Sequence, residues 1–182
     1  MSDATSTVAD ELAIRNLIAR AAHVADSGTD ADVTALWVPD GVWTSSTEGI
    51  RSGIDEIVAG AHARRASKTS GTGSGARHLI TTVQVAFDDP DHARVESNFL
   101  FCRSTPTGSA LIEVLGHYSD EVRRTSDGWR FNRRDITFGG ADAPALTPRG
   151  GRGHEGMARG TGERATRARR HPDSWTERTR VH

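Results

Sequence analysis

The chain contains one cysteine, one lysine and one tyrosine among its 182 residues, and the scarcity of cysteine excludes several kinds of site. The single Cys102 cannot form an internal disulfide or a cysteine-rich zinc site, and its apolar neighbours indicate a buried, inert thiol. The histidines show no metal-ligand spacing. We therefore expect no metal site.

Long apolar runs are also absent. No stretch approaches the roughly 20 apolar residues that a membrane-spanning helix needs. Residues 1–15 lack both the basic start and the apolar segment of a secretion signal. These absences predict a cytoplasmic protein without a membrane partner.

Charge is divided unevenly along the chain, although the formal net charge is only -1. Residues 141–182 contain nine arginines and five acidic residues, which leaves residues 1–140 with 14 basic and 19 acidic ones. This tail has almost no large apolar residues, so we expect one domain over 1–140 followed by a disordered segment. The arginine-rich stretch 164–170 has no interleaved aromatic residues and the body is acidic, so no nucleic-acid partner is expected.

Helical and strand patterns occupy different parts of the body. Helical spacing of apolar residues is found in 10–26, 29–37 and 54–66, and strand patterns are found in 42–45, 77–87, 93–104, 110–123 and 128–138. The Ser, Thr and Gly-rich segment 67–75 indicates a mobile loop that could cover a pocket. Helices followed by antiparallel strands predict an α+β fold, in which three N-terminal helices pack in a curved sheet shaped like a cone.

The segment 111–136 has the clearest strand pattern, with two strands joined by a Ser-Asp-Gly turn. Its first strand alternates apolar even positions with polar odd ones, which predicts that Tyr118 and Asp120 point inward. A buried, unpaired carboxylate would be costly, so we expect Asp120 to meet an arginine such as Arg103 or Arg133.

The strand 77–87 presents two different faces. Its apolar face comprises Leu79, Val83, Val85 and Phe87. His78 shares the other, more polar face with Thr82, and that face fits either a pocket wall or an exposed dimer surface. His117 points away from Tyr118, toward the sheet surface or a subunit contact.

The order of these elements and several short motifs resemble the SnoaL-like branch of the nuclear transport factor 2 (NTF2-like) superfamily. That superfamily includes scytalone dehydratase, ketosteroid isomerase and dioxygenase β-subunits. The motifs are ADSG at 25–28, LWVPDGVW at 36–43, EGIRSGIDEI at 48–57, RH at 77–78, GHYSDEVRR at 116–124 and DGWRF at 127–131. The resemblance covers about residues 8–138 and implies the cone-shaped α+β fold, which hosts enzymes, binding modules and assembly subunits.

The resemblance also implies site residues. Catalytic members place an ionisable residue near the end of the first helix and a histidine at the start of the strand after the third helix, positions held here by Asp26 and His78. His78 would be the general acid/base, Asp26 its partner or the base, and Tyr118 a hydroxyl or oxyanion donor. The tyrosine and asparagine that the family often has are replaced by Ala21 and Thr82, which weakens the hydroxyl and amide donors of the site. The resemblance also places Gly28 and Thr29 near the positions of the active-site tyrosine and aspartate of scytalone dehydratase, which argues against scytalone dehydration.

The residues taken alone leave other roles open. A carboxylate near a helix C-terminus is disfavoured by the helix dipole, so Asp26 needs a further reason to be there, although it also fits a solvated group or a cap for the next helix. Tyr118 equally fits a core tyrosine with a bonded hydroxyl.

Two functions follow from the resemblance. The first is a cofactor-independent isomerase, cyclase, dehydratase or hydrolase acting on a small, mostly apolar carbonyl or polycyclic substrate. The pocket walls would comprise Ala22, Trp43, Phe99, Phe101, Asp120 and Trp129. The second is a non-catalytic module that binds a small hydrophobic molecule or serves assembly. Under either function we expect a homodimer through the sheet, which a monomer in light scattering would contradict.

Overall fold

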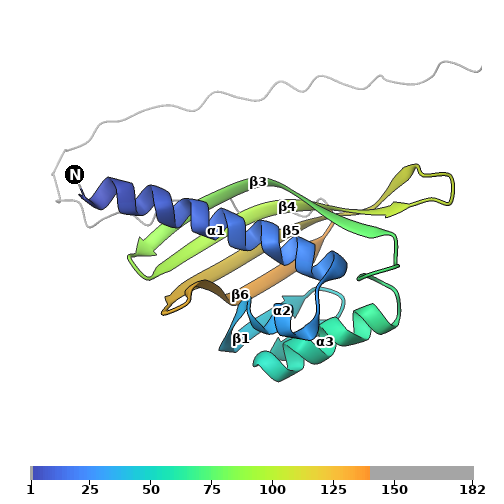
Figure 1. Cartoon of the computed structure of the whole chain (residues 1–182), viewed down its shortest axis with the longest axis horizontal. Helices are drawn as coiled ribbons and strands as arrows, with labels where there is room; N and C mark the ends of the chain where they lie inside the picture. Colours follow the sequence, from blue (N-terminus) through green and yellow to red (C-terminus); the bar gives the residue numbers. More distant parts are fainter. Residues whose placement is uncertain (1, 140–182) are drawn as a thin grey trace, which may run out of the picture. The chain divides into compact units, whose positions relative to one another are not determined.

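The structure is a computed structural model that describes residues 2–139. The tail, for which the composition predicts disorder, lies outside these residues. Helices and strands in the described part are α1 (Ser2–Ser27), α2 (Asp30–Thr34), β1 (Trp37–Ser45), β2 (Gly49–Ser52), α3 (Ile54–Ala66), β3 (Ala76–Asp89), β4 (His92–Ser104), β5 (Ala110–Thr125) and β6 (Gly128–Phe138). Figure 1 shows α1 lying across the sheet. None of the helices in this part of the chain is both long and apolar enough to cross a membrane.

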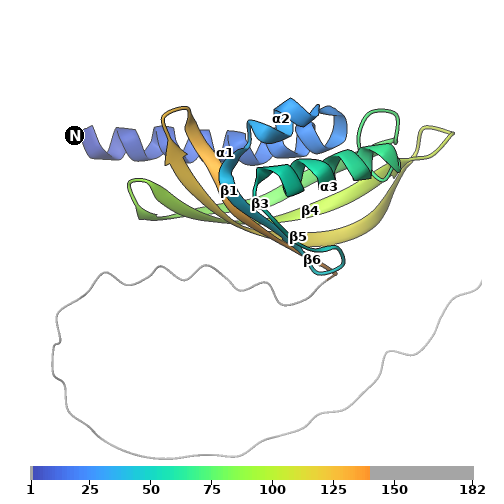
Figure 2. The same ribbon diagram turned by 90° about the horizontal axis from the view of Figure 1, so that it is seen from below.

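The six strands form one sheet in the order β2-β1-β6-β5-β4-β3. Neighbouring strands are antiparallel except β1 and β6, which run parallel. Figure 2 shows the three helices on one side of the sheet, which curves toward them. The predicted α+β fold, with helices held in a curved and mostly antiparallel sheet, is confirmed.

Helix α1 supplies the largest helical part of the core. Ile14 and Ile18, one turn apart on the same helix face, are 0% and 1% exposed. They belong to one cluster with Val95, Val122 and Phe131 from three strands of the sheet. Removing this apolar surface from water is the main favourable contribution to folding and fixes α1 against the sheet.

The N-terminal half departs from the sequence pattern in three places. Helix α1 begins at Ser2, before the predicted start at Asp10, and α2 ends at Thr34, so that Trp37 starts a strand. In β1, Trp37 is buried and its ring lies 5.2 Å from that of Phe131 in β6. Tertiary packing of this kind overrides local helical spacing. The short strand β2, which pairs with β1, was not predicted.

Strand β3 contains a bulge at its centre. Its pairing with β4 moves from Thr81 opposite Asn98 to Gln84 opposite Glu96, so β3 has one residue more than its partner. Thr82 has φ +51° there, in the left-handed region that accompanies such irregularities. Because successive strand residues face opposite sides, the extra residue exchanges the two faces of β3.

This bulge corrects the prediction that Leu79 and Val83 share one apolar face of the strand. Leu79 is half exposed, whereas Val83 packs against the core. Thr82 was predicted on the same face as His78, but it is exposed and accepts a hydrogen bond from Asn98. His78 therefore faces inward together with the apolar residues beyond the bulge.

The outer face of the sheet carries a row of leucines across three strands. Leu79, Leu100 and Leu115 lie opposite one another in β3, β4 and β5, and the first and last of them are half exposed. A contiguous apolar surface of this kind is typical of an interaction face. Pairing of two copies through the sheet stays a prediction.

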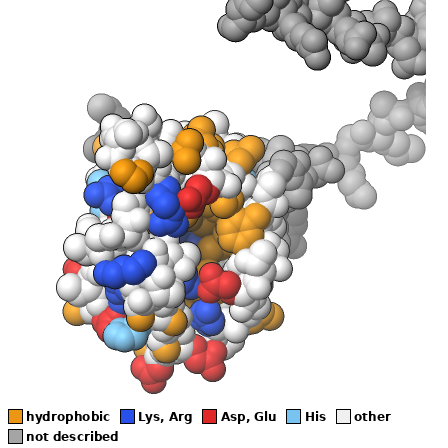
Figure 3. All heavy atoms as spheres, turned by 90° about the vertical axis from the view of Figure 1, so that its right-hand side faces the viewer, with side chains coloured by type: hydrophobic (Ala, Val, Ile, Leu, Met, Phe, Trp, Pro, Cys, Tyr) orange, Lys and Arg blue, Asp and Glu red, His pale blue; other side chains and the backbone are white. Residues whose placement is uncertain are grey.

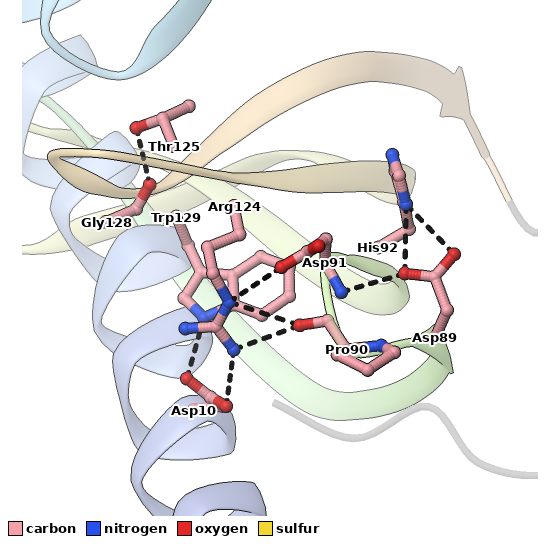
Figure 4. A network of polar contacts seen from close by, with 9 residues as sticks. All are labelled: Asp10, Asp89, Pro90, Asp91, His92, Arg124, Thr125, Gly128 and Trp129. Carbon is pink, nitrogen blue, oxygen red and sulfur yellow. Dashed lines mark hydrogen bonds and ion pairs between the residues drawn. The ribbon is translucent and has the colours of Figure 1, made fainter.

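The N-terminal half of α1 is held by the polar network in Figure 4. Asp10 accepts hydrogen bonds from Arg124 at 2.5 Å and from the Trp129 indole at 3.2 Å. The Arg124 guanidinium lies 4.6 Å from the Trp129 ring centre and also donates to the carbonyl of Pro90. The network thus connects the helix to the β3–β4 and β5–β6 turns.

Replacing Asp10 with asparagine should lower stability at pH 7 and make it less sensitive to acid. The hydrogen bond from Arg124 holds the pKa of Asp10 below its ordinary value. A carboxylate with a lowered folded pKa stabilises above its unfolded pKa, and this contribution is lost as the pH falls through the folded value. Urea unfolding from pH 7 to pH 2.5 should show the two proteins converging. Asp127→Asn, in an exposed turn, is the control that should keep the wild-type profile.

Candidate active site

Asp26 and His78 meet at the edge of the sheet. Asp26 lies in the last turn of α1, and His78 lies near the start of the edge strand β3. His78 Nδ1 is 2.7 Å from Asp26 Oδ1, and the backbone N–H of His78 donates to both carboxylate oxygens at 3.1 Å. Because β3 is the edge strand, no further strand accepts a hydrogen bond from the backbone N–H of His78, and the Asp26 carboxylate accepts it instead. This contact gives a reason for an acidic residue at the C-terminal end of α1.

These bonds give the two side chains different roles. Asp26 is buried and both its oxygens already accept hydrogen bonds, so it can hold the Nδ1 proton of His78 in place. His78 Nε2 makes no hydrogen bond to the residues between 2 and 139. Phe101 packs edge-on against the imidazole with the ring centres 4.9 Å apart. A ring oriented in this way presents an Nε2 lone pair as a base.

The imidazole faces a cavity of about 260 Å³. Its lining comprises Ala25, Trp43, Glu48, Arg64, Thr69, Ser70, His78, Phe99, Phe101, Val114, Tyr118, Arg134, Ile136 and Phe138. A smaller cavity of about 90 Å³ shares part of this lining. In Figure 3, which views the right-hand end of Figure 1, hydrophobic side chains lie in a hollow bordered by basic and acidic ones. The site is therefore apolar with a few convergent polar groups, the usual composition of a small-molecule site.

Tyr118 forms part of the cavity wall opposite the helices. Its ring stacks on Phe99 with the centres 4.3 Å apart, and Phe99 in turn covers Gly116. A Cβ at Gly116 would come within 2.2 Å of the Phe99 ring, so only glycine permits this stacking. Burial raises the pKa of Tyr118 to about 12, so the phenol stays protonated as a donor. Its oxygen makes no hydrogen bond within the described chain.

Asp120 forms a buried ion pair beneath Tyr118. Its carboxylate accepts two hydrogen bonds of 2.7 Å from the guanidinium of Arg134, directly across the β5–β6 pair. The partner is therefore Arg134, not Arg103 or Arg133 as predicted, because Arg134 is the residue opposite Asp120 on the inner face. Burial raises the pKa of Asp120. For Arg134, burial alone would lower the pKa, but attraction to Asp120 raises it overall.

The structure brings together most of the predicted site residues. His78, Tyr118, Trp43, Phe99 and Phe101 line the cavity, and Asp26 bonds His78 from behind. The remaining predicted wall residues, Ala22, Asp120 and Trp129, are not among the lining residues. Ala22 is replaced in this role by Ala25, one helical turn later, and Trp129 packs beside Asp10.

Sequence patterns missed the arginines of the cavity. Arg64 on α3 and Arg134 on β6 both line it. The helical spacing of α3 identified only its apolar residues, and nothing in the local sequence distinguishes Arg64 from Arg65 beside it. Arg134 could have been found from the hairpin register, since counting back from the Ser-Asp-Gly turn brings it near Asp120.

Several solved structures have the same architecture. An NTF2-like protein with a cystatin-like fold from Novosphingobium aromaticivorans is 26% identical, with a TM-score of 0.68 over 78% of this chain and 90% of the other. Aln2 from a Streptomyces species is 20% identical, with a TM-score of 0.63 over 70% and 89%. The hexachlorocyclohexane dehydrochlorinase LinA-type3 from Novosphingobium barchaimii is 15% identical, with a TM-score of 0.63 over 80% and 100%.

The sequence itself matches a family model. No curated protein matches the chain, but residues 6–135 match the model of the SnoaL-like domain. That range includes α2, α3, β1 to β5 and most of α1 and β6, with both Asp26 and His78. The chain therefore belongs to the SnoaL-like family, within the NTF2-like superfamily.

Proposed function

We propose that the protein is a cofactor-independent enzyme that abstracts a proton from carbon next to a carbonyl group, in an isomerase, cyclase or lyase reaction. The observation that carries this proposal is the contact between His78 Nδ1 and Asp26 Oδ1 at 2.7 Å, with Nε2 left facing an apolar cavity. A carboxylate that orients a neutral imidazole is a common arrangement for general acid/base catalysis near neutral pH.

In the proposed step, Nε2 of His78 takes the proton from the α-carbon. The electron pair of the broken C–H bond forms the enolate, and its negative charge develops on the carbonyl oxygen. The protonated Tyr118 hydroxyl would donate to that oxygen, and Asp26 would stabilise the imidazolium. Return of the proton to another carbon gives isomerisation. Departure of a leaving group gives elimination, the type of reaction that the name dehydrochlorinase describes for one similar structure.

The volume of the cavity limits the size of the substrate. Drug-sized ligands occupy sites of roughly 300–1,000 Å³, and a cavity of about 150 Å³ accepts benzene. The cavity of about 260 Å³ therefore suits a molecule of one or two rings better than a four-ring steroid. Its aromatic wall of Phe99, Phe101 and Tyr118 favours a flat, apolar body.

Deuterium exchange tests the proposal without knowledge of the product. The protein is incubated in D₂O with one-ring and two-ring ketones, including acetophenone, 2-indanone and 2-tetralone, and loss of the α-proton signal is followed by NMR. Exchange above the buffer rate for at least one ketone is expected. Exchange at the buffer rate throughout the panel would count against a base in this cavity.

A non-catalytic binding module is the second candidate. It is favoured by Ala21 and Thr82, which replace the family's frequent tyrosine and asparagine, and by the outward position of Thr82 in the bulge. A module of this kind would bind a ketone of the panel, seen as an increase in thermal stability, with no exchange of its α-proton.

A further inference from the structure

The wall formed by α3, β1, β2 and the β1–β2 turn holds a charge cluster that the proposed proton transfer does not use. Arg64 Nη1 and Arg51 Nη2 both bond Oε2 of Glu48, at 3.0 and 2.8 Å. The two guanidinium groups lie 4.9 and 5.1 Å from the ring centre of Trp43. Strands β6, β5 and β4 separate this wall from His78. Because two cations share one carboxylate, the cluster keeps one positive charge in excess.

Arg64 is the member of this cluster that has free donors on the cavity. One N–H binds Glu48, whereas its Nε and Nη2 make no hydrogen bond to any residue in the range 2–139. Its side chain is only 24% exposed, and burial lowers the pKa of Arg64. A guanidinium that has lost most of its water and still has unused donors gains strongly from an anionic acceptor.

A second unused donor lies beside it. Ser70 is only 7% exposed and lines the cavity, and its hydroxyl has no hydrogen-bond partner among the described residues. The backbone N–H groups of Thr69 and Ser70 both donate to the carbonyl of Arg64, which keeps this loop next to α3. The hydroxyl is reached from the cavity and is not sealed in the core, so a ligand oxygen that accepts from it replaces water there and adds one hydrogen bond to binding.

Together these groups divide the cavity into chemically different parts. His78, oriented by Asp26, provides a base, Arg64 and Ser70 provide hydrogen-bond donors and a positive charge, and Phe99, Phe101 and Tyr118 provide an aromatic surface in the same cavity. Glu48 also lines the cavity and repels anions, which limits the favourable ligand charge to one.

On the basis of the proposed function, we infer that the substrate is a small cyclic carboxylic acid. Its carboxylate binds Arg64 and Ser70, its ring occupies the aromatic part of the cavity, and its acidic C–H faces Nε2 of His78. Binding at both ends fixes which carbon reaches the base, so Arg64 determines substrate specificity. The single excess charge matches one carboxylate rather than a phosphate dianion.

Benzoate and benzamide test this inference, because they have nearly the same shape and differ in charge. Both are titrated by NMR into wild-type protein, Arg64→Gln and the control Arg94→Gln. Arg94 pairs with Asp88, and its side chain is 23% exposed, close to the 24% of Arg64. We expect Arg64→Gln to weaken benzoate binding about 10- to 100-fold and to change benzamide binding less than about twofold. The control variant should bind both as wild type does.

Three further measurements decide the outcome. Arg64→Lys should recover part of the benzoate affinity, and Ser70→Ala should lose about five-fold. Should Arg64→Gln fail to fold, wild-type protein must still bind benzoate more tightly than benzamide. Equal binding of the two ligands, or no benzoate binding at tens of millimolar, would overturn the inference.

Failure of acid recognition can be separated from failure of the proposed function. Arg64-dependent benzoate binding without any ketone exchange would retain the anion site and remove the base. Ketone exchange together with equal binding of benzoate and benzamide would retain the base and remove the anion site.

Discussion

Replacing His78 with asparagine should slow α-proton exchange of an active ketone by about 10²- to 10⁴-fold, the range that a positioned general base contributes. Asparagine can still donate an N–H toward Asp26, but it offers no basic nitrogen at the position of Nε2. KM should change little, because Phe99 and Phe101 still form the wall that contacts the ring. The measurement is the exchange rate as a function of ketone concentration, which separates kcat from KM.

His117→Asn is the matched control for this result. His117 lies on the outer face of the sheet, where its ring contacts Glu96 at 2.5 Å and Asn98 at 3.1 Å. The same substitution there should leave the exchange rate unchanged, although it removes a histidine and its carboxylate contact. An equal loss of exchange in both variants would show that the effect comes from stability, and retained exchange in His78→Asn would exclude His78 as the base.

Replacing Asp120 with alanine should destabilise the protein by about 3–5 kcal/mol, because it leaves Arg134 buried without its partner. Asp120 is 1% exposed and accepts both hydrogen bonds of that guanidinium at 2.7 Å. The freed charge would lie over the rings of Tyr118 and Phe131, which compensate it only in part. Urea unfolding at pH 7 measures the change, which is a large fraction of the stability of an ordinary domain.

Two variants show whether the loss comes from the unpaired charge. The double replacement Asp120→Leu with Arg134→Met should recover most of the stability, because apolar side chains of similar volume often substitute for a buried ion pair. Asp40→Ala removes an exposed partner of Arg123 and should cost less than about 1 kcal/mol. A small loss in Asp120→Ala, comparable to that in Asp40→Ala, would contradict the ion pair as a major contribution.

Local patterns predicted the elements of the sheet better than the orientation of their side chains. The strands from β3 to β6 were placed within a few residues of their bounds, because alternation and turn residues are local signals. The inward position of Tyr118 and Asp120 followed from the same alternation. The orientation of the β3 side chains could not be predicted from alternation, because the bulge at Thr82 depends on pairing with β4 and leaves no local signal.

The candidate site was predicted in part. Asp26 and His78 were identified through the family resemblance, since they lie 52 residues apart along the chain and no local pattern connects them. Arg134 was missed as the partner of Asp120 because that pairing depends on register. Arg64 was missed because its importance comes from Glu48 and Ser70, which reach the same cavity from other elements.

The sequence by itself determined the α+β class, the order of the elements and the two ionisable residues of the site, because periodicity, turn residues and family motifs are properties of the chain. The tertiary structure alone decided that Asp26 fills the place of a missing strand beside His78. It also decided that the bulge in β3 turns His78 inward and that Arg64 adds a positive charge to the cavity wall. These features depend on side chains from distant segments, and only the packing of the curved sheet around its helices brings them together.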